Sequence, residues 1–206
     1  MGRRTKAEAA QTRQEIIDAA RRVFHERGVS RTSMENVAQA AGVSRGAIYW
    51  HFENKAALFF AMREQTATVL DQVHSRMLSP EVVNPLDAIE HSLCLLFEIL
   101  ENNPLVRETF EIMSLRCEYV DEFAPVLQEV IRPHADYLIT LKDLYAQAAS
   151  KGFLRRGLDV EAVAHDTLAF SSGLFKQWLA SLPGDDWRTH TQCRIKAHVA
   201  LRRADR

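Results

Sequence analysis

The sequence predicts an all-α fold of about nine helices, and three observations lead to that prediction. The 206 residues contain only eight glycines and six prolines, so interruptions of the backbone are few. Apolar residues recur at helical spacing over most of the chain. No stretch alternates convincingly between apolar and polar residues, as a half-buried strand would. The chain is long enough for one or two small domains with a sizeable core.

The composition narrows the class of protein. With 47% hydrophobic and 26% charged residues, the chain is typical of a globular protein. No apolar run approaches a membrane span, and the N-terminus MGRRTKAEAAQTRQ lacks the apolar core of a signal peptide, so we expect a cytoplasmic protein. Three scattered cysteines argue against a disulfide framework or a zinc site, and we expect no metal and no cofactor.

The first predicted helix spans about residues 6–27 and ends at Gly28, since glycine commonly follows a helix. Five apolar residues at i, i+1, i+4, i+7 and i+8 form its single buried stripe. They are Ile16, Ile17, Ala20, Val23 and Phe24.

Two short helices and a long one should follow. Thr32 or Ser33 caps the first short helix, which ends at Gly42, and Ser44 caps the second. Two short helices joined by a tight glycine turn are the pattern of a helix-turn-helix, here over residues 33–52. Asn54 caps a fourth helix, which the pattern extends to about Met77.

Five more helices complete the predicted fold. Asn-Pro pairs begin helices near 85–102 and 104–117, because proline suits the first helical position. A long helix over about 121–151 contains Pro133, which should kink or split it. The last two helices are predicted at about 160–182 and 186–204.

Charge is distributed unevenly along the chain. Residues 1–60 contain ten Lys and Arg against six Asp and Glu, a net charge of +4. The remaining residues contain sixteen basic and twenty-one acidic side chains, a net charge of −5. This asymmetry indicates a polyanion-binding end, although a solvated helix surface explains four charges equally well.

The second short helix presents the residue types that nucleic-acid binding needs. Once Ile48 and Phe52 are assigned to the core, Arg45, Tyr49 and Trp50 remain on its outer side. An arginine can fork onto a guanine edge or a phosphate, and a helix start can hold a phosphate near Lys55. The alternative is that the aromatic residues are half-buried packing residues and that the lysine is solvated.

A resemblance to a known family supports the first interpretation. The stretch GVSRGAIYWHFENK, with FHERGVSRTS before it, resembles the N-terminal domain of the TetR/AcrR family of transcriptional repressors. RETFEIMSLRCEYVDEF resembles the subgroup that controls multidrug efflux pumps. The resemblance implies a DNA-binding domain at 1–56, a ligand-binding and dimerisation domain at 57–206, and a homodimer formed through the last two helices.

The resemblance also implies roles for individual residues near the DNA. Arg45 and Gly46 match positions close to the bases. Trp50 matches a position that either forms a wall beside the DNA contacts or is itself a DNA contact. The matches to phosphate contacts and backbone clamps are Thr32, Ser33, Tyr49, His51 and Lys55.

The C-terminal half contains three apolar helix faces that could line a pocket for a small molecule. Such faces are more often plain core, but aromatic, methionine and hydroxyl side chains together suit an adaptable cavity. The resemblance places Phe110, Ser114, Leu168, Ser171 and Ser172 on pocket positions, where Phe110 and Ser172 are less polar than the subgroup's residues. The candidate ligand residues are Met62, Leu93, Leu96, Phe97, Phe110, Met113, Ser114, Cys117, Leu168, Ser171, Ser172 and Phe175.

The leading hypothesis is therefore a repressor, not an enzyme, that binds a palindromic operator as a dimer. It would control a multidrug efflux operon and be released by a hydrophobic small molecule, with the helix from Asn54 to Met77 as the lever between the two functions. One alternative is an activator, or a regulator of another pathway, with the same DNA-binding helix. Another is a helical protein that binds small molecules and has no DNA role.

Overall fold

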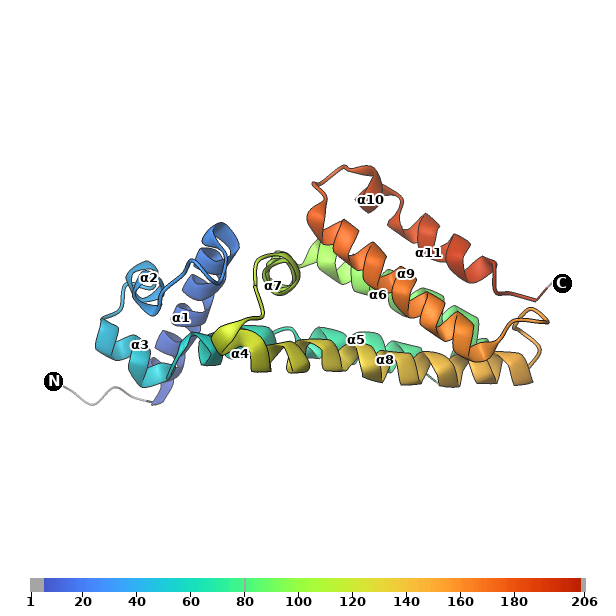
Figure 1. The fold of residues 1–206 in the computed structure, drawn as a ribbon, viewed down its shortest axis with the longest axis horizontal. Coiled ribbons are helices and arrows are strands. Elements are labelled where there is room, and N and C mark those ends of the chain that lie inside the picture. Colours follow the sequence, from blue (N-terminus) through green and yellow to red (C-terminus); the bar gives the residue numbers. More distant parts are fainter. Residues whose placement is uncertain (1–5, 80, 205–206) are drawn as a thin grey trace. The chain divides into compact units, whose positions relative to one another are not determined.

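The computed structural model describes residues 6–79 and 81–204, and within them only helices, connections and one isolated β-bridge between Leu154 and Arg203 are present (Figure 1). The prediction of an all-α fold is confirmed. The helices are α1 (Lys6–Arg27), α2 (Met34–Ala40), α3 (Arg45–His51), α4 (Lys55–Glu64), α5 (Ala67–Met77), α6 (Pro85–Asn102), α7 (Pro104–Leu115), the short 3-10 helix η1 (Asp121–Phe123), α8 (Ala124–Ser150), α9 (Val160–Ala180), α10 (Asp186–Thr189) and α11 (Thr191–Ala200).

The predicted single helix from Asn54 to Met77 is wrong, because α4 ends at Glu64 and α5 begins at Ala67. Thr66 lies in the break and is 2% exposed. Its hydroxyl donates to the carbonyl of Arg63 at 2.7 Å. A threonine that bonds a carbonyl three residues earlier competes with the helical hydrogen-bond ladder. The predicted lever is therefore two helices.

Contacts with α1 hold the residue that begins this break. The Gln65 side chain accepts a hydrogen bond from Arg21 at 2.6 Å and donates one to Gln14 at 2.9 Å. The same guanidinium donates to Asp18 at 2.9 Å, and Arg21 is only 3% exposed. Because α1 lies more than 40 positions earlier in the chain, the local pattern around Gln65 could not show these contacts.

Two other predicted helices also differ from the structure. The last predicted helix is divided into α10 and α11 at His190. The long helix α8, in contrast, runs without a break through Pro133, so the proline does not split it.

The described chain divides into two compact units. Unit 1 contains the helices up to Ala67 together with Leu105–Gln128. Unit 2 contains Thr68–Pro104 and the chain from Glu129 onward. The predicted functional boundary at residues 56 and 57 is a separate matter and stays a prediction.

Unit 1 is built around the apolar stripe of α1. All five predicted stripe residues are buried, with exposed fractions of 7% or less. From α4, Leu58, Phe59 and Met62 are completely buried. The ring of Phe59 lies 6.4 Å from that of Phe24 and 5.4 Å from that of Phe123, between centroids. Unit 1 therefore has an aromatic core to which both α1 and the segment before α8 contribute.

The helix α7 and the connection after it brace the N-terminal helices of unit 1. The His25 ring in α1 lies 2.7 Å from the Glu111 carboxylate in α7. The backbone N–H of Val29, just after α1, donates to the carbonyl of Arg116 at 2.9 Å. These contacts explain why residues after Leu105 pack with the N-terminal helices.

Unit 2 packs α6, α9 and α11 around large buried side chains. Trp178 is 1% exposed, and its ring lies 5.9 Å from that of Phe97, between centroids. The Arg188 guanidinium lies 4.3 Å from the Trp178 ring, in a cation–π contact. Arg203, after α11, pairs with Glu90 of α6 at 3.0 Å. The C-terminal helices are thereby fixed to α6.

A chain of buried polar groups crosses the interior of unit 2. The Tyr145 hydroxyl of α8 shares a hydrogen bond of 2.7 Å with the Thr167 hydroxyl of α9. Thr167 shares another, of 3.0 Å, with the His198 ring of α11. The His198 ring also stacks on Phe170 at 3.9 Å between centroids. Three helices are thus joined by partners that satisfy one another.

This chain of polar groups makes the stability of unit 2 depend on pH. Burial and, second, the Arg202 guanidinium lower the pKa of His198 from 6.5 to about 4, and Asp166 opposes them. Between about pH 6.5 and pH 4, His198 therefore binds a proton in the unfolded chain but not in the folded chain. We expect the free energy of unfolding to be highest above about pH 6.5 and to fall as the pH drops toward about 4.

Urea denaturation at several pH values measures this dependence. A His198→Gln variant keeps a hydrogen-bonding group near Thr167 but cannot titrate, so its stability should fall less steeply over the same range. Equal slopes for the wild type and this variant would contradict the assignment.

Candidate DNA-binding surface

The helices α2 and α3 form the predicted helix-turn-helix. The Ser33 hydroxyl accepts from the Asn36 N–H at 3.2 Å, and the Ser44 hydroxyl accepts from the Ala47 N–H at 3.2 Å. Each serine therefore caps its helix, as predicted. Between the helices Gly42 has φ 68°, a conformation that favours glycine.

The inner face of α3 anchors it to unit 1. Ile48 is 0% exposed, and Phe52, the residue after the helix, is 4% exposed. The Arg13 guanidinium of α1 lies 5.1 Å from the Phe52 ring centroid. These contacts fix which face of α3 turns outward.

The outer face of α3 carries three large side chains. Tyr49 is 42% exposed and Trp50 is 73% exposed. The Arg45 side chain is 75% exposed and lies over the Tyr49 ring, 5.8 Å from its centroid. Beyond its chain neighbours and the α3 backbone, a Cβ built at Gly46 would have the Ser44 hydroxyl as its nearest atom, at 4.0 Å, so the backbone there stays open to an approaching surface. These four residues form one surface, which we call the α3 surface.

Trp50 is a surface residue rather than a packing residue. Its ring meets the neighbouring His51 ring edge-on, at 4.5 Å between centroids and 87° between planes. Most of the indole remains exposed. Because Tyr49 and Trp50 are both exposed on α3, they form a contiguous aromatic patch beside Arg45, and such a patch can mark an interaction site.

Two of the predicted DNA contacts lie apart from the α3 surface. Thr32 is 3% exposed, and its hydroxyl donates to the Gly28 carbonyl at 2.8 Å. The Lys55 side chain is only 14% exposed, and its Nζ lies 3.3 Å from a Glu122 carboxylate oxygen. The structure therefore brings Arg45, Gly46, Tyr49 and Trp50 together on α3, where His51 follows Trp50, and it leaves Ser33 exposed at the start of α2. It covers the side chains of Thr32 and Lys55.

The structure adds two carboxylates that sequence reasoning missed. Glu35 in α2 lies 3.3 Å from the Arg45 guanidinium. A hydrogen bond to its own backbone and, more weakly, the charge of Arg45 hold the pKa of Glu35 below its usual value. Glu122 pairs with Lys55 from 67 positions further along the chain, and no local spacing could have shown that pair.

The candidate ligand residues fall in both units. Unit 1 contains Met62, Phe110, Met113, Ser114 and Cys117, and unit 2 contains Leu93, Leu96, Phe97, Leu168, Ser171, Ser172 and Phe175. In unit 2 the structure brings the Phe97 and Phe175 rings within 6.5 Å between centroids. In unit 1 Ser114 is exposed, and burial raises the pKa of the Cys117 thiol to about 11, so that thiol stays neutral.

Sequence reasoning also missed Tyr137 in α8 of unit 2. Its hydroxyl is buried and makes no hydrogen bond in the part of the chain that the structure describes. Burial raises its pKa well above the usual range, and the nearby Ser171 hydroxyl opposes that shift, although it donates its own hydrogen bond to the Leu168 carbonyl and does not reach hydrogen-bonding geometry with Tyr137. A buried hydroxyl without a partner carries a desolvation cost that a bound ligand could relieve. Tyr137 therefore joins Ser171 as a candidate polar group.

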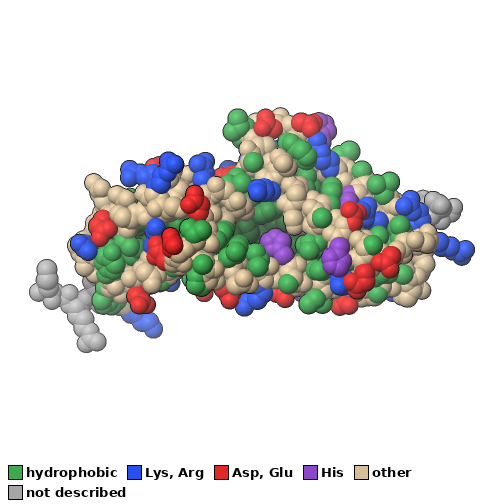
Figure 2. Space-filling model, viewed as in Figure 1, with side chains coloured by type: hydrophobic (Ala, Val, Ile, Leu, Met, Phe, Trp, Pro, Cys, Tyr) green, Lys and Arg blue, Asp and Glu red, His purple; other side chains and the backbone are tan. Residues whose placement is uncertain are grey.

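The charge on the visible face of unit 1 does not by itself indicate a function (Figure 2). On the face of unit 1 shown in Figure 2, basic and acidic side chains are intermixed. None of the helices that the structure describes combines the length and apolar character that a membrane crossing needs. The α3 surface, rather than the charge on this face, therefore indicates a nucleic-acid contact.

A helix-turn-helix with an exposed arginine and two aromatic residues on its second helix defines a class, the DNA-binding regulators. Comparison with known proteins identifies the family. Residues 16–62 match the profile described as "Bacterial regulatory proteins, tetR family". The HTH-type transcriptional regulator TtgR of Pseudomonas putida is 37% identical over 183 residues, covering 87% of this chain and 85% of that protein.

Two solved structures share the fold over nearly the whole chain. NalD, the secondary repressor of the MexAB-OprM multidrug efflux pump in Pseudomonas aeruginosa, superposes with a TM-score of 0.82 at 28% identity, covering 96% of this chain and 98% of that one. SmeT, the repressor of the Stenotrophomonas maltophilia pump SmeDEF, in complex with triclosan, has a TM-score of 0.77 at 27% identity, covering 95% and 93%.

The chain belongs to the TetR family of bacterial transcriptional regulators. It is a regulator of transcription and not an enzyme, and its relatives include repressors of multidrug efflux pumps.

Proposed function

We propose that this chain is a ligand-responsive repressor that binds a palindromic operator as a dimer and controls a multidrug efflux operon. The observation that carries the proposal is the α3 surface, which exposes Arg45, Tyr49 and Trp50 while Ile48 anchors the opposite face. The similarity to NalD, a repressor of an efflux pump, supports the choice of operon. A repressor of this kind acts on the chromosome, and hence in the cytoplasm.

In the proposed complex α3 lies in the major groove. The Arg45 guanidinium reaches a guanine edge or a phosphate, and the open backbone at Gly46 lets the helix approach closely. The Tyr49 hydroxyl and the His51 ring offer hydrogen bonds to the phosphate backbone. For Arg45 to reach DNA it must leave Glu35, a pair so exposed that its loss costs little.

Operator selection from randomised duplex DNA tests the DNA-binding function. We expect a palindromic consensus and an affinity that falls steeply with salt concentration. A helical carrier without a DNA role would show no salt-dependent binding to any duplex. In a transcription assay a repressor lowers the output of a promoter that carries the selected operator, and an activator raises it.

The proposed inducer is a hydrophobic small molecule, and the SmeT complex with triclosan supports that class of ligand. The aromatic pair Phe97 and Phe175 and the polar groups of Ser171 and Tyr137 supply the chemistry in unit 2. Because α4 ends at Glu64, the proposed shift on ligand binding concerns α4 rather than a continuous helix to Met77. A ligand of the native state must raise the melting temperature, and an inducer must also release the operator.

A Tyr137→Phe variant tests the proposed polar contact. Removing an unpaired buried hydroxyl should leave the free energy of unfolding unchanged or raise it by up to about 1 kcal/mol. The affinity for a hydroxylated inducer should fall about two- to tenfold. Denaturation and ligand titration measure the two effects.

The matched control is Tyr145→Phe, which removes a hydroxyl that is hydrogen-bonded to Thr167 at 2.7 Å. This variant should lose about 1 kcal/mol of stability. Equal losses in the two variants would show that the Tyr137 hydroxyl is already satisfied.

The proposed dimer forms through α9 and α11. Along α9 the small residues Ala169, Gly173 and Ala180 are exposed, and a Cβ built at Gly173 would meet no atom within 4 Å beyond its chain neighbours and the adjacent α9 backbone. Small side chains allow a partner helix to approach closely, so this side of α9 suits a second copy. Light scattering in solution would give twice the mass of one chain if the dimer forms.

A further inference from the structure

Lys55 occupies an electrostatically unfavourable position. It is the first residue of α4, directly after the cap residue Asn54. The positive end of the helix dipole repels a cation there, so an ammonium at this position needs an anion. The structure supplies one within the chain, since the Lys55 Nζ lies 3.3 Å from Glu122 Oε1. The Phe123 ring centroid lies 5.5 Å from the same Nζ.

Buried neighbours hold Glu122 in this position. Phe123 is 4% exposed and packs edge-on against Phe59 of α4, at 5.4 Å between centroids. Tyr119 meets the same Phe59 ring at 6.5 Å, and its hydroxyl donates to the Met113 carbonyl at 2.6 Å. The carboxylate is therefore carried by a segment docked on α4, rather than by a loosely attached loop.

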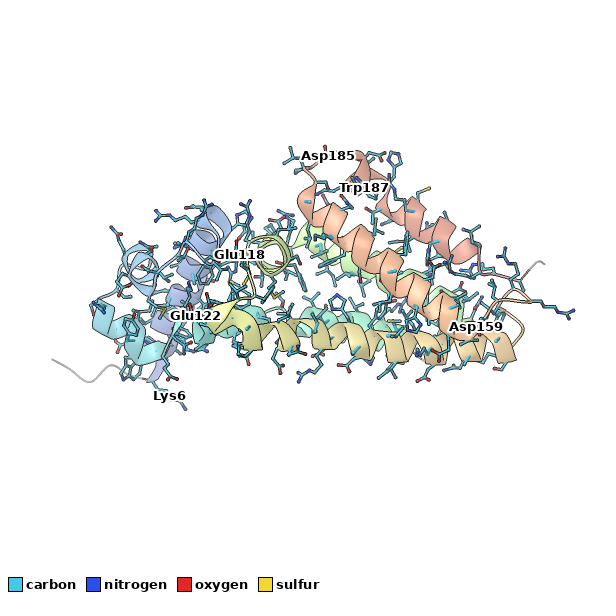
Figure 3. The ribbon with its side chains drawn as sticks, viewed as in Figure 1. Lys6, Glu118, Glu122, Asp159, Asp185 and Trp187 are labelled. Carbon is cyan, nitrogen blue, oxygen red and sulfur yellow. The ribbon has the colours of Figure 1, made fainter. Side chains whose placement is uncertain are left out.

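The backbone of this segment is strained at the residue before Glu122. Asp121 has φ 48°, in the left-handed region that side-chain-bearing residues rarely adopt. Such a conformation costs of order 1 kcal/mol and persists only where surrounding contacts impose it. Here it turns the chain into η1 and the start of α8, where Figure 3 shows Glu122, and it thus helps to aim the carboxylate at Lys55.

The ion pair remains accessible to a competing anion. The Glu122 side chain is 49% exposed, although that of Lys55 is only 14% exposed. Because the Lys55 ammonium is mostly covered it needs an anionic partner, and a phosphate group can take the place of the half-exposed carboxylate in that role. DNA phosphates and this carboxylate offer the ammonium the same chemistry, an anionic oxygen.

We infer that Glu122 is an intramolecular substitute for a DNA phosphate. In the absence of DNA its carboxylate pairs with the Lys55 ammonium, and this pairing lowers the affinity of the protein for the duplex. The inference rests on the proposed DNA-binding function, with Lys55 as a backbone contact. It assigns the segment from Tyr119 to Phe123 a role in setting DNA affinity. The phosphate contact of Lys55 forms only when this carboxylate is displaced.

The test uses the full chain and a random-sequence duplex of about three helical turns, because phosphate contacts do not depend on sequence. Glu122→Gln removes the charge and keeps the shape of the side chain. It should bind the duplex about two- to fivefold more tightly than the wild type at low salt. The slope of log affinity against log salt concentration should steepen by up to about 0.9, the value of one phosphate contact.

Glu118→Gln is the matched control. Glu118 is exposed and lies in the connection between α7 and η1, and Figure 3 shows it apart from Glu122. The control makes the same change in net charge but leaves the Lys55 ion pair intact. Its smaller effect on duplex affinity therefore measures the contribution of net charge alone. Circular dichroism of both variants verifies that the helices are intact.

A double-mutant cycle completes the test. In a Lys55→Gln background, Glu122→Gln should raise the affinity for the duplex no more than the Glu118→Gln control does. The inference is overturned if Glu122→Gln binds no more tightly than the control, binds more weakly than the wild type, or gains equally without Lys55. If the wild type shows no salt-dependent binding to any duplex, the proposed function itself fails.

Discussion

Replacing Arg45 and Tyr49 together by alanine is expected to weaken operator binding about 10- to 100-fold. Both side chains are exposed on the α3 surface, and a well-placed arginine contact to a base or phosphate accounts for about 1–3 kcal/mol of binding. Each phosphate contact that is lost should also flatten the salt dependence by about 0.9 in slope. Fluorescence anisotropy on the selected operator, over a range of salt concentrations, measures both effects.

The same double variant should fold as the wild type does. Neither side chain is buried, so the free energy of unfolding should stay within about 0.5 kcal/mol of the wild-type value. Arg156→Ala is the charge-matched control, because Arg156 is exposed in unit 2, in the turn before α9. If this control weakens binding as much as the double variant does, net charge rather than the α3 surface explains the loss.

Replacing Phe59 by alanine is expected to destabilise the protein by about 3–5 kcal/mol. Phe59 is completely buried and contacts Phe24, Tyr119 and Phe123. Its removal would leave a cavity at the point where α1, α4 and the segment before α8 meet, and the neighbouring rings cannot all close in. Urea denaturation followed by circular dichroism measures the loss.

Trp50→Ala is the comparison that makes the Phe59 result informative. Trp50 is a larger aromatic side chain in the same unit, but it is 73% exposed. Its removal should change the free energy of unfolding by no more than about 0.5 kcal/mol, while it weakens operator binding. Comparable destabilisation by the two substitutions would mean that Trp50 packs against the protein after all.

Together these variants distinguish aromatic residues that pack in the core from those that are exposed for binding, a difference that the sequence pattern does not show. GVSRGAIYWHFENK places Tyr49, Trp50 and Phe52 within four positions. The structure buries Phe52 and exposes the two others, because α3 turns only one face toward α1. The cations of this stretch also receive partners, since Arg45 meets Glu35 and Lys55 meets Glu122.

Local features of the fold could be read from the sequence. Ser44 and Asn54 cap the helices that they were predicted to cap, because each side chain bonds an N–H only three positions away, and Asp159 caps α9 in the same way. The stripe of α1 is buried as predicted, since helical periodicity alone places its residues on one face. The all-α class and the helix-turn-helix follow from the same short-range information.

Features that depend on distant partners could not be read in this way. The break after α4 accompanies contacts of Gln65 with Arg21 and Gln14 of α1, and periodicity predicted an unbroken helix there. The candidate site behaves likewise. Arg45, Tyr49 and Trp50 could be assigned to an outer face from helix geometry, but the covering of Lys55 required knowledge of Glu122.

The helical class, most helix starts and the motif that presents Arg45 thus follow from the order of residues, because the interactions responsible lie within a few positions of one another. The interruption of helices, the lack of a partner at the Tyr137 hydroxyl and the pairing of Glu122 with Lys55 follow only from the folded arrangement. The physical reason is the same in each case. Burial and ion pairing depend on distances through space, and the chain brings these residues together only when it has folded.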